Sequence, residues 1–129
     1  MLTFSELRAT NETRCRRWHG TRDNLNKTNS DGMMGWTLSD WFTAFAGEVG
    51  EAGNVIKKLN RVRDGMTGNK ERDIVTQLKL DLGSELADAM IYLDLLANAA
   101  GINLENEVIN KFNIVSQRNN FPERLVYES

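Results

Sequence analysis

The sequence predicts an all-α domain, a bundle of four main helices. Apolar residues recur every three or four positions in four segments, capping residues precede three of them, and no stretch alternates apolar and polar residues as a strand does. The 129 residues suffice for one core, so residues 1–129 are predicted to form a single domain. The helices are predicted at residues 3–19, 38–62, 74–100 and 104–117.

The composition narrows the classes of partner. The formal net charge is −2 and acidic and basic residues are interspersed, so the chain lacks the basic surface of a nucleic-acid-binding protein. No apolar run approaches the roughly 20 residues that cross a bilayer, and no leader segment is evident. We expect a cytoplasmic protein. The single cysteine, Cys15, excludes internal disulfides, and the single histidine, His19, argues against a site of several imidazoles.

The first helix begins with a capping box, because Thr3 is followed three residues later by Glu6. The residues at helical spacing are Phe4, Leu7, Arg8, Asn11, Cys15 and Trp18. The C-terminal part gathers Arg14, Arg16, Arg17, Trp18 and His19. One interpretation is a basic last turn that complements the helix dipole, with Trp18 in the core. The other places Trp18 or His19 against a nucleobase and an arginine near phosphate.

The second helix follows a long polar connection, residues 20–35, which is either a functional lid or pocket wall or simply disordered. Thr37 and Asp40 provide its capping signal. The helix contains three glycines: Gly47, Gly50 and Gly53. Each lowers the helix propensity by about 1 kcal/mol relative to alanine. They permit close approach of a backbone, an ion or a ligand, and tight helix packing explains them equally well.

Two of the helices carry acidic pairs inside their apolar faces. The face of the second helix contains Trp41, Ala44, Glu48, Glu51, Val55, Leu59 and Val62. The face of the third contains Leu78, Leu82, Glu85, Asp88, Ala89, Tyr92, Leu96 and Ala99. A carboxylate taken out of water without a counterion costs several kcal/mol or takes up a proton through a raised pKa. Four acids around divalent cations are compensated, so metal binding between these helices is the first hypothesis.

The ligand types predict the kind of metal. Side chains three apart on a helix have Cβ atoms about 5–6 Å apart and can share a cation. An oxygen-only set suits Mg²⁺, for which Mn²⁺ can substitute, whereas a di-iron bundle uses Glu-x-x-His motifs that the chain lacks. Four carboxylates match two divalent ions, which commonly activate water and orient phosphate oxygens. Alternatively, the acids lie at the edge of the apolar faces and pair with Lys57, Lys58 or Lys79.

The fourth helix is bounded by clear signals. Gly101 fits the position after the end of the third helix, Asn103 can cap the fourth, and Pro122 ends regular structure. The apolar residues of the fourth helix are Leu104, Val108, Ile109, Phe112 and Val115. The short tail after Pro122 is suited to packing on a neighbouring subunit.

Two segments resemble a known family. EVGEAGN at residues 48–54 and ELADAMIYLDLLANAAGINLENEVINKFN at residues 85–113 resemble the ExxE…ExxD signature of the MazG-like all-α nucleoside triphosphate pyrophosphohydrolases. The resemblance covers residues 36–118. It implies Mg²⁺ ligation by Glu48, Glu51, Glu85 and Asp88. Family members cleave between the α and β phosphates, release a nucleoside monophosphate and pyrophosphate, and assemble as dimers or dimers of dimers, often with shared sites.

The resemblance also implies substrate contacts. Lys58, Lys111, Asn113 and Arg118 would hold the triphosphate. By position alone, Asn54, Lys57, Lys58 and Arg61 flank the acidic face, and the three charged ones are either solvated or reach a phosphate. Tyr92 is either a core residue or a hydrogen-bond donor to a ligand. Candidate base contacts are Trp18, His19, Trp36, Trp41 and residues 20–35.

The chain most resembles phage-type members directed at purine deoxynucleotides, dGTP and dATP, such as the MazZ branch, which implies the host cytoplasm. It departs from the family at Gly47, where an acid is common, and in a longer connection between the acidic pairs.

The mechanism expected from the acids uses two ions. One, on Glu48 and Glu51, activates water for attack on the α-phosphorus, with Glu51 the preferred general base, and the other, on Glu85 and Asp88, binds α and β oxygens. The alternative class is a non-catalytic helical oligomerisation module whose acids are structural.

Overall fold

The computed structural model describes residues 1–19, 35–66 and 71–127, apart from the side chains of residues 19 and 71–73. The described residues form four α-helices: α1 (Phe4–His19), α2 (Leu38–Arg63), α3 (Glu71–Ala99) and α4 (Leu104–Arg118). The predicted all-α class is confirmed, and the largest difference in a boundary is at α3, which begins at Glu71 instead of residue 74. The predicted lid, residues 20–35, lies outside the described residues except for Gly35.

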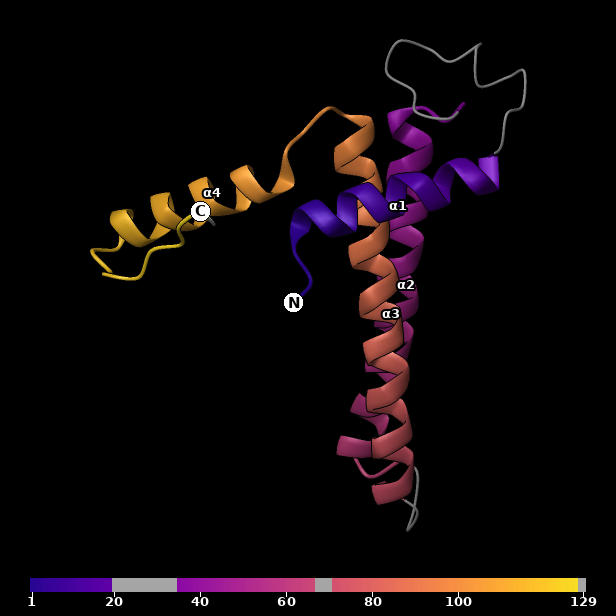
Figure 1. Ribbon diagram of the computed structural model, residues 1–129. Coiled ribbons are helices and arrows are strands. Elements are labelled where there is room, and N and C mark those ends of the chain that lie inside the picture. Colours follow the sequence, from indigo (N-terminus) through magenta and orange to yellow (C-terminus); the bar gives the residue numbers. More distant parts are fainter. Residues whose placement is uncertain (20–34, 67–70, 128–129) are drawn as a thin grey trace.

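The helices have distinct places in the fold (Figure 1). α2 and α3 run antiparallel as a long hairpin, α1 crosses this hairpin near one end, and α4 extends away from it. The principal packing interface is between α2 and α3, with a smaller one between α1 and α3. None of the helices in the described ranges is both long and apolar enough to cross a membrane.

The predicted capping residues are confirmed. The backbone N–H of Glu6 donates to Thr3 Oγ1 at 3.1 Å, and Thr3 N–H donates back to the Glu6 carboxylate at 3.2 Å. Thr37 forms the corresponding pair of bonds with Asp40, and Asn103 Oδ1 accepts from the backbone at the start of α4. Gly101 has φ +71°, a left-handed conformation that ends α3 and turns the chain into α4.

Two apolar clusters hold the α2–α3 hairpin together. The cluster under α1 contains buried Cys15, Trp41 and Leu95. The cluster at the far end of the hairpin contains buried Val55, Val62 and Leu78. Along both helices, the predicted acidic pairs fall between the two clusters, so the core is interrupted where the carboxylates lie.

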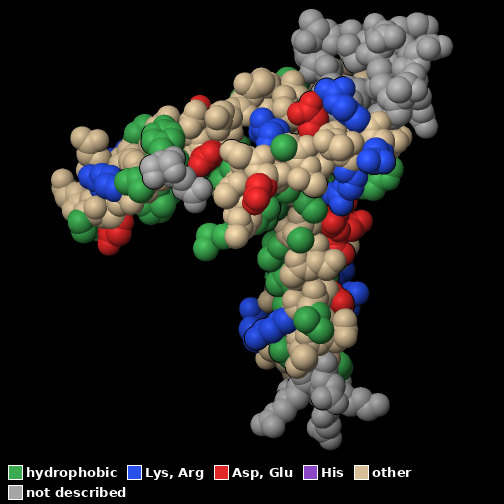
Figure 2. All heavy atoms as spheres, viewed as in Figure 1, with side chains coloured by type: hydrophobic (Ala, Val, Ile, Leu, Met, Phe, Trp, Pro, Cys, Tyr) green, Lys and Arg blue, Asp and Glu red, His purple; other side chains and the backbone are tan. Residues whose placement is uncertain are grey.

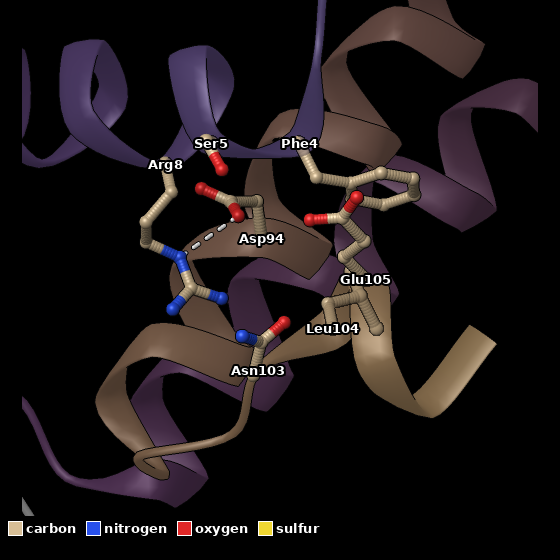
Figure 3. Close-up of a pocket in the computed structure, with 7 residues that line it drawn as sticks. All are labelled: Phe4, Ser5, Arg8, Asp94, Asn103, Leu104 and Glu105. Carbon is tan, nitrogen blue, oxygen red and sulfur yellow. Dashed lines mark hydrogen bonds and ion pairs between the residues drawn. The ribbon is translucent and has the colours of Figure 1, made fainter. Parts of the chain in front are cut away.

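A polar joint fastens α1 to α3. Asp94 is 1% exposed and accepts hydrogen bonds from Arg8 Nε at 3.0 Å and Asn11 Nδ2 at 3.2 Å. Arg8 also donates to the backbone oxygen of Ile102 at 3.0 Å. A small cavity of about 80 Å³ lies beside this ion pair, between the start of α1 and the start of α4 (Figure 3). The burial of Asp94 could not be predicted from local patterns, because its partner Arg8 is far away along the chain.

The apolar face of α4 is largely uncovered by the other residues that the structure describes. Ile109 is buried and Leu104 is partly buried, but Val108, Phe112 and Val115 are exposed. Hydrophobic side chains are visible on the surface of this arm in Figure 2. The following tail folds back along α4, where Asn113 exchanges two hydrogen bonds with the backbone of Leu125 at 2.8 and 2.9 Å. The arm is therefore ordered by its own tail and not by the hairpin.

Candidate functional site

Three carboxylates meet between α2 and α3. Glu48 projects from α2, while Glu85 and Asp88 project from successive turns of α3. One carboxylate oxygen from each residue lies within 4.8 Å of the other two. The antiparallel pairing of the two helices thus brings the predicted acidic positions together from segments almost 40 residues apart.

Two oxygens of this cluster lack a hydrogen-bond partner. Glu48 Oε2 and Glu85 Oε2 are buried and neither is hydrogen bonded. The ion pairs found among the described residues do not include these carboxylates. Among the described residues, therefore, none of Lys57, Lys58 and Lys79 forms the ion pair with the acids that the alternative interpretation predicts. Buried polar oxygens almost always have a hydrogen-bond partner, so the two that lack one make this cluster the candidate functional site.

The electrostatics of the cluster agree with its geometry. Burial raises the pKa of Glu48 above its usual value, and the negative charges of Glu51 and Asp88 raise it further. Burial also raises the pKa of Glu85, together with its side-chain interaction with Glu51 and the charges of Asp88 and Glu48. Glu48 and Glu85 therefore resist ionisation mainly because of burial and also because their neighbours are acids. A bound cation would lower the pKa of these carboxylates and so oppose the effect of the neighbouring acids.

Glu51 takes a different place from the one predicted. The sequence suggested two pairs, Glu48 with Glu51 and Glu85 with Asp88, each on its own ion. The tight group instead joins both helices through Glu48, Glu85 and Asp88, while Glu51 is exposed and interacts with Glu85 from the side.

Tyr92 links the cluster to the apolar core. Its ring packs against the cluster of Cys15, Trp41 and Leu95. Burial raises the pKa of its hydroxyl, and the charges of Glu48 and Asp88 raise it further. The core interpretation of Tyr92 is confirmed for its ring, and its role as a hydrogen-bond donor to a ligand stays a prediction.

Several of the residues predicted to bind the substrate lie away from the carboxylate cluster. Asn54 and Lys58 are exposed on α2, one to three turns beyond Glu48. Lys111, Asn113 and Arg118 lie on the α4 arm, which extends away from the hairpin within one chain (Figure 1). Asn113 is hydrogen bonded to Leu125, so its observed role is to hold the tail.

Trp18 also differs from one prediction. Its side chain is 64% exposed, so its assignment to the core is wrong. Arg14 lies over the Trp18 ring, with its Cζ 5.0 Å from the ring centroid. The side chain of His19 lies outside the described residues. Trp36 and Trp41 contact each other at a centroid distance of 4.5 Å, and the burial of Trp41 makes it a core residue.

The donor set fits a hard divalent cation. All the grouped ligand atoms are carboxylate oxygens, which Mg²⁺ and Mn²⁺ prefer over nitrogen and sulfur. Two of those carboxylates have a buried oxygen without a hydrogen-bond partner, which leaves these oxygens able to act as ligands.

A scan against models of protein families, a search of curated proteins and a search of solved structures each find no match to this chain. The resemblance to the MazG-like family therefore stays a prediction from the sequence motifs.

Proposed function

We propose that this protein is a Mg²⁺-dependent nucleoside triphosphate pyrophosphohydrolase of the MazG-like type. Its expected substrates are purine deoxynucleoside triphosphates, dGTP and dATP, which it cleaves to the monophosphate and pyrophosphate. The observation that carries the proposal is the group of Glu48, Glu85 and Asp88, which draws three carboxylates within 4.8 Å without a cation from the described residues.

The residues of the cluster have separate roles in this proposal. Glu48, Glu85 and Asp88 hold the metal ions, with Glu51 completing the set from its edge. When bound, divalent ions lower the pKa of water and neutralise charge on phosphate oxygens. Glu51 is exposed next to the cluster and accepts the proton of the attacking water. The hydroxyl of Tyr92 donates a hydrogen bond to a ligand oxygen or to a carboxylate.

The direct test is product analysis. Each of the common NTPs and dNTPs is incubated with the protein and Mg²⁺ or Mn²⁺, and the products are separated by ion-exchange chromatography. We expect dGTP or dATP to give the monophosphate and pyrophosphate. Glu48→Gln should lower turnover by about 100-fold or more, because it removes one charge from the metal ligands.

Asp81→Asn is the matched control. Asp81 lies two turns before Asp88 on α3 and accepts a hydrogen bond from Gln77 outside the cluster, so its loss should leave turnover within about twofold. Products of diphosphate and orthophosphate would contradict the cleavage position. Equal activity of the wild type and Glu48→Gln would remove the carboxylate cluster from the reaction.

A second candidate function is self-association, for which α4 gives a specific reason. Val108, Phe112, Ile114 and Val115 are exposed on a helix that contacts the hairpin little. Three apolar residues of α2, Phe42, Val49 and Ile56, are also exposed and recur every seven positions, the spacing of a helix-packing stripe. Covering both surfaces with a second copy of the chain would produce the homodimer or homotetramer expected from the sequence, with or without catalysis.

Light scattering after size-exclusion chromatography tests this candidate. We expect a dimer or tetramer in the wild type and a shift towards the monomer in Phe112→Ser, which places a hydroxyl on the apolar face of α4. Glu107→Ser, an exposed polar position on the same helix, is the control. A monomeric wild type at all concentrations would contradict self-association but would leave the hydrolase proposal standing.

A further inference from the structure

The way α1 crosses α3 separates its side chains into two flanks. Asn11 lies in the buried face and donates to the backbone oxygen of Ile91 at 2.9 Å. On one flank, Arg8 reaches towards the C-terminal end of α3, where it contacts Asp94 and Ile102. At 100° per residue, Arg14 lies on the opposite flank of this buried face. That flank is directed towards the part of α3 that leads to Asp88.

Tyr92 lies one turn after Asp88 on α3 and packs against the cluster that contains Cys15, the residue next to Arg14 on α1, so Arg14 and the carboxylates share this region. Burial raises the pKa of the Tyr92 hydroxyl, the charges of Glu48 and Asp88 raise it further, and the charge of Arg14 lowers it. The hydroxyl therefore lies within electrostatic reach of the acids and of the arginine. Figure 2 likewise shows basic side chains near the C-terminal end of α1 beside acidic side chains of the α2–α3 hairpin.

Arg14 is held in place but keeps its hydrogen-bond donors available. Its guanidinium lies 5.0 Å from the centroid of the exposed Trp18 ring, in a cation–π contact. Arg8 and Arg16 are engaged with acids, whereas Arg14 has no ion pair among the described residues. A guanidinium stacked on a ring presents its N–H edge outward, in the geometry that matches phosphate oxygens.

We propose that Arg14, supported by the Trp18 ring, binds phosphate oxygens of a polyphosphate whose other oxygens face the carboxylate cluster. This inference rests on the proposed function and adds to it a phosphate-binding residue from α1. The cluster contributes only negative charge, so a polyanion held there needs cations from the metal and from the protein. Arg14 supplies such a charge from within the same chain, while Lys111 and Arg118 lie on the projecting α4 arm.

Calorimetric titration with tripolyphosphate in the presence of Mn²⁺ tests the inference without requiring hydrolysis. We expect Arg14→Gln to weaken binding about tenfold or more, because one charged hydrogen-bonding group is lost. Arg14→Lys keeps the charge without the fork and should give a smaller loss. Arg16→Gln is the control, because Arg16 pairs with Glu12 at 2.8 Å on the far flank, and it should change the affinity by less than twofold.

The outcomes separate the two proposals. Wild-type affinity in Arg14→Gln, or no Mn²⁺-dependent binding of tripolyphosphate by the wild type, would overturn the inference. Thermal unfolding of each variant checks that it is folded, and Arg14→Lys carries the test if Arg14→Gln is not. If tripolyphosphate binding depends on Arg14 but no dNTP releases pyrophosphate, the hydrolase proposal fails and the phosphate-binding role of Arg14 stands.

Discussion

Asp94 and Asp88 lie six residues apart on α3, but Asp94 is paired with an arginine and Asp88 is grouped with other acids. Asp94 is 1% exposed, and Arg8 and Asn11 both donate hydrogen bonds to its carboxylate. Asp88 is grouped with Glu48 and Glu85, and none of the three has an ion-pair partner among the described residues. The charge at the α1–α3 joint is thus compensated by Arg8, whereas no described residue forms an ion pair with the carboxylate cluster.

The presence or absence of a basic partner distinguishes a structural acid from a candidate ligand on the same helix. A buried carboxylate with its own arginine needs nothing further for stability. Neighbouring acids and burial raise the pKa of Glu48 and of Glu85, so ionising these two carboxylates costs stability, and clustered groups with shifted pKa values are typical of functional sites. The joint has its own orphan, Asn11 Oδ1, but this atom is uncharged and leaves no charge uncompensated.

The largest expected effect is at the joint. Arg8→Ala leaves Asp94 buried without its cation, and we expect it to lower the free energy of unfolding by about 3 kcal/mol. The control is Arg16→Ala, which breaks an exposed pair with Glu12 and should cost about 0.3–0.5 kcal/mol. Urea denaturation followed by circular dichroism measures both. Similar losses in the two variants would mean that burial does not distinguish these ion pairs.

Much of the fold and of the site was predictable because it depends on local spacing. Thr3 caps through Glu6, three residues away, and a helix of 3.6 residues per turn necessarily places Glu85 and Asp88 on one face. The same periodicity directed Glu48 towards the third helix. Local rules of this kind also gave the helix boundaries to within a few residues.

The rest depends on contacts between distant segments. The burial of Asp94 was not predictable from its neighbours in sequence, because its partner, Arg8, lies 86 residues away. Trp18 has the helical spacing of a core residue, but it lies in the last turn of α1 and is 64% exposed. Helical spacing alone does not tell where along α1 the packing against the other helices ends. The direction of α4 follows from the turn at Gly101, so the separation of Lys111 from the acids was not predictable from helical periodicity.

The carboxylate cluster should make stability fall with pH in the absence of metal. The pKa of Glu48 is raised above 4.5 in the folded protein, so between 4.5 and the raised value the folded state holds a proton that the unfolded state has released. The free energy of unfolding contributed by this group therefore decreases as pH rises through that window. Thermal unfolding of the wild type and of Glu48→Gln, compared from pH 4 to pH 7 in a metal chelator, measures the difference.

Metal should reverse this loss. At pH 7, Mn²⁺ at about 100 times its dissociation constant should raise the free energy of unfolding by about 2.7 kcal/mol in the wild type. The gain should be much smaller in Glu48→Gln, which lacks one ligand charge, and unchanged in Asp81→Asn. An equal gain in all three proteins would show that Mn²⁺ binds away from the cluster and would remove the contrast with Asp94.

The smallest expected effect concerns the glycines beside the acids. A Cβ added at Gly50 meets no atom within 4 Å in the part of the chain that the structure describes, so tight packing against these residues does not account for that glycine. Gly50→Ala should therefore raise the free energy of unfolding of the metal-free monomer by about 0.5–1 kcal/mol through helix propensity. The control, Gly101→Ala, should be destabilising because Gly101 has φ +71°. If Gly50→Ala instead lowers stability, and does so more at higher protein concentration, the open side of α2 is packed against a second chain and the glycine is there for that contact.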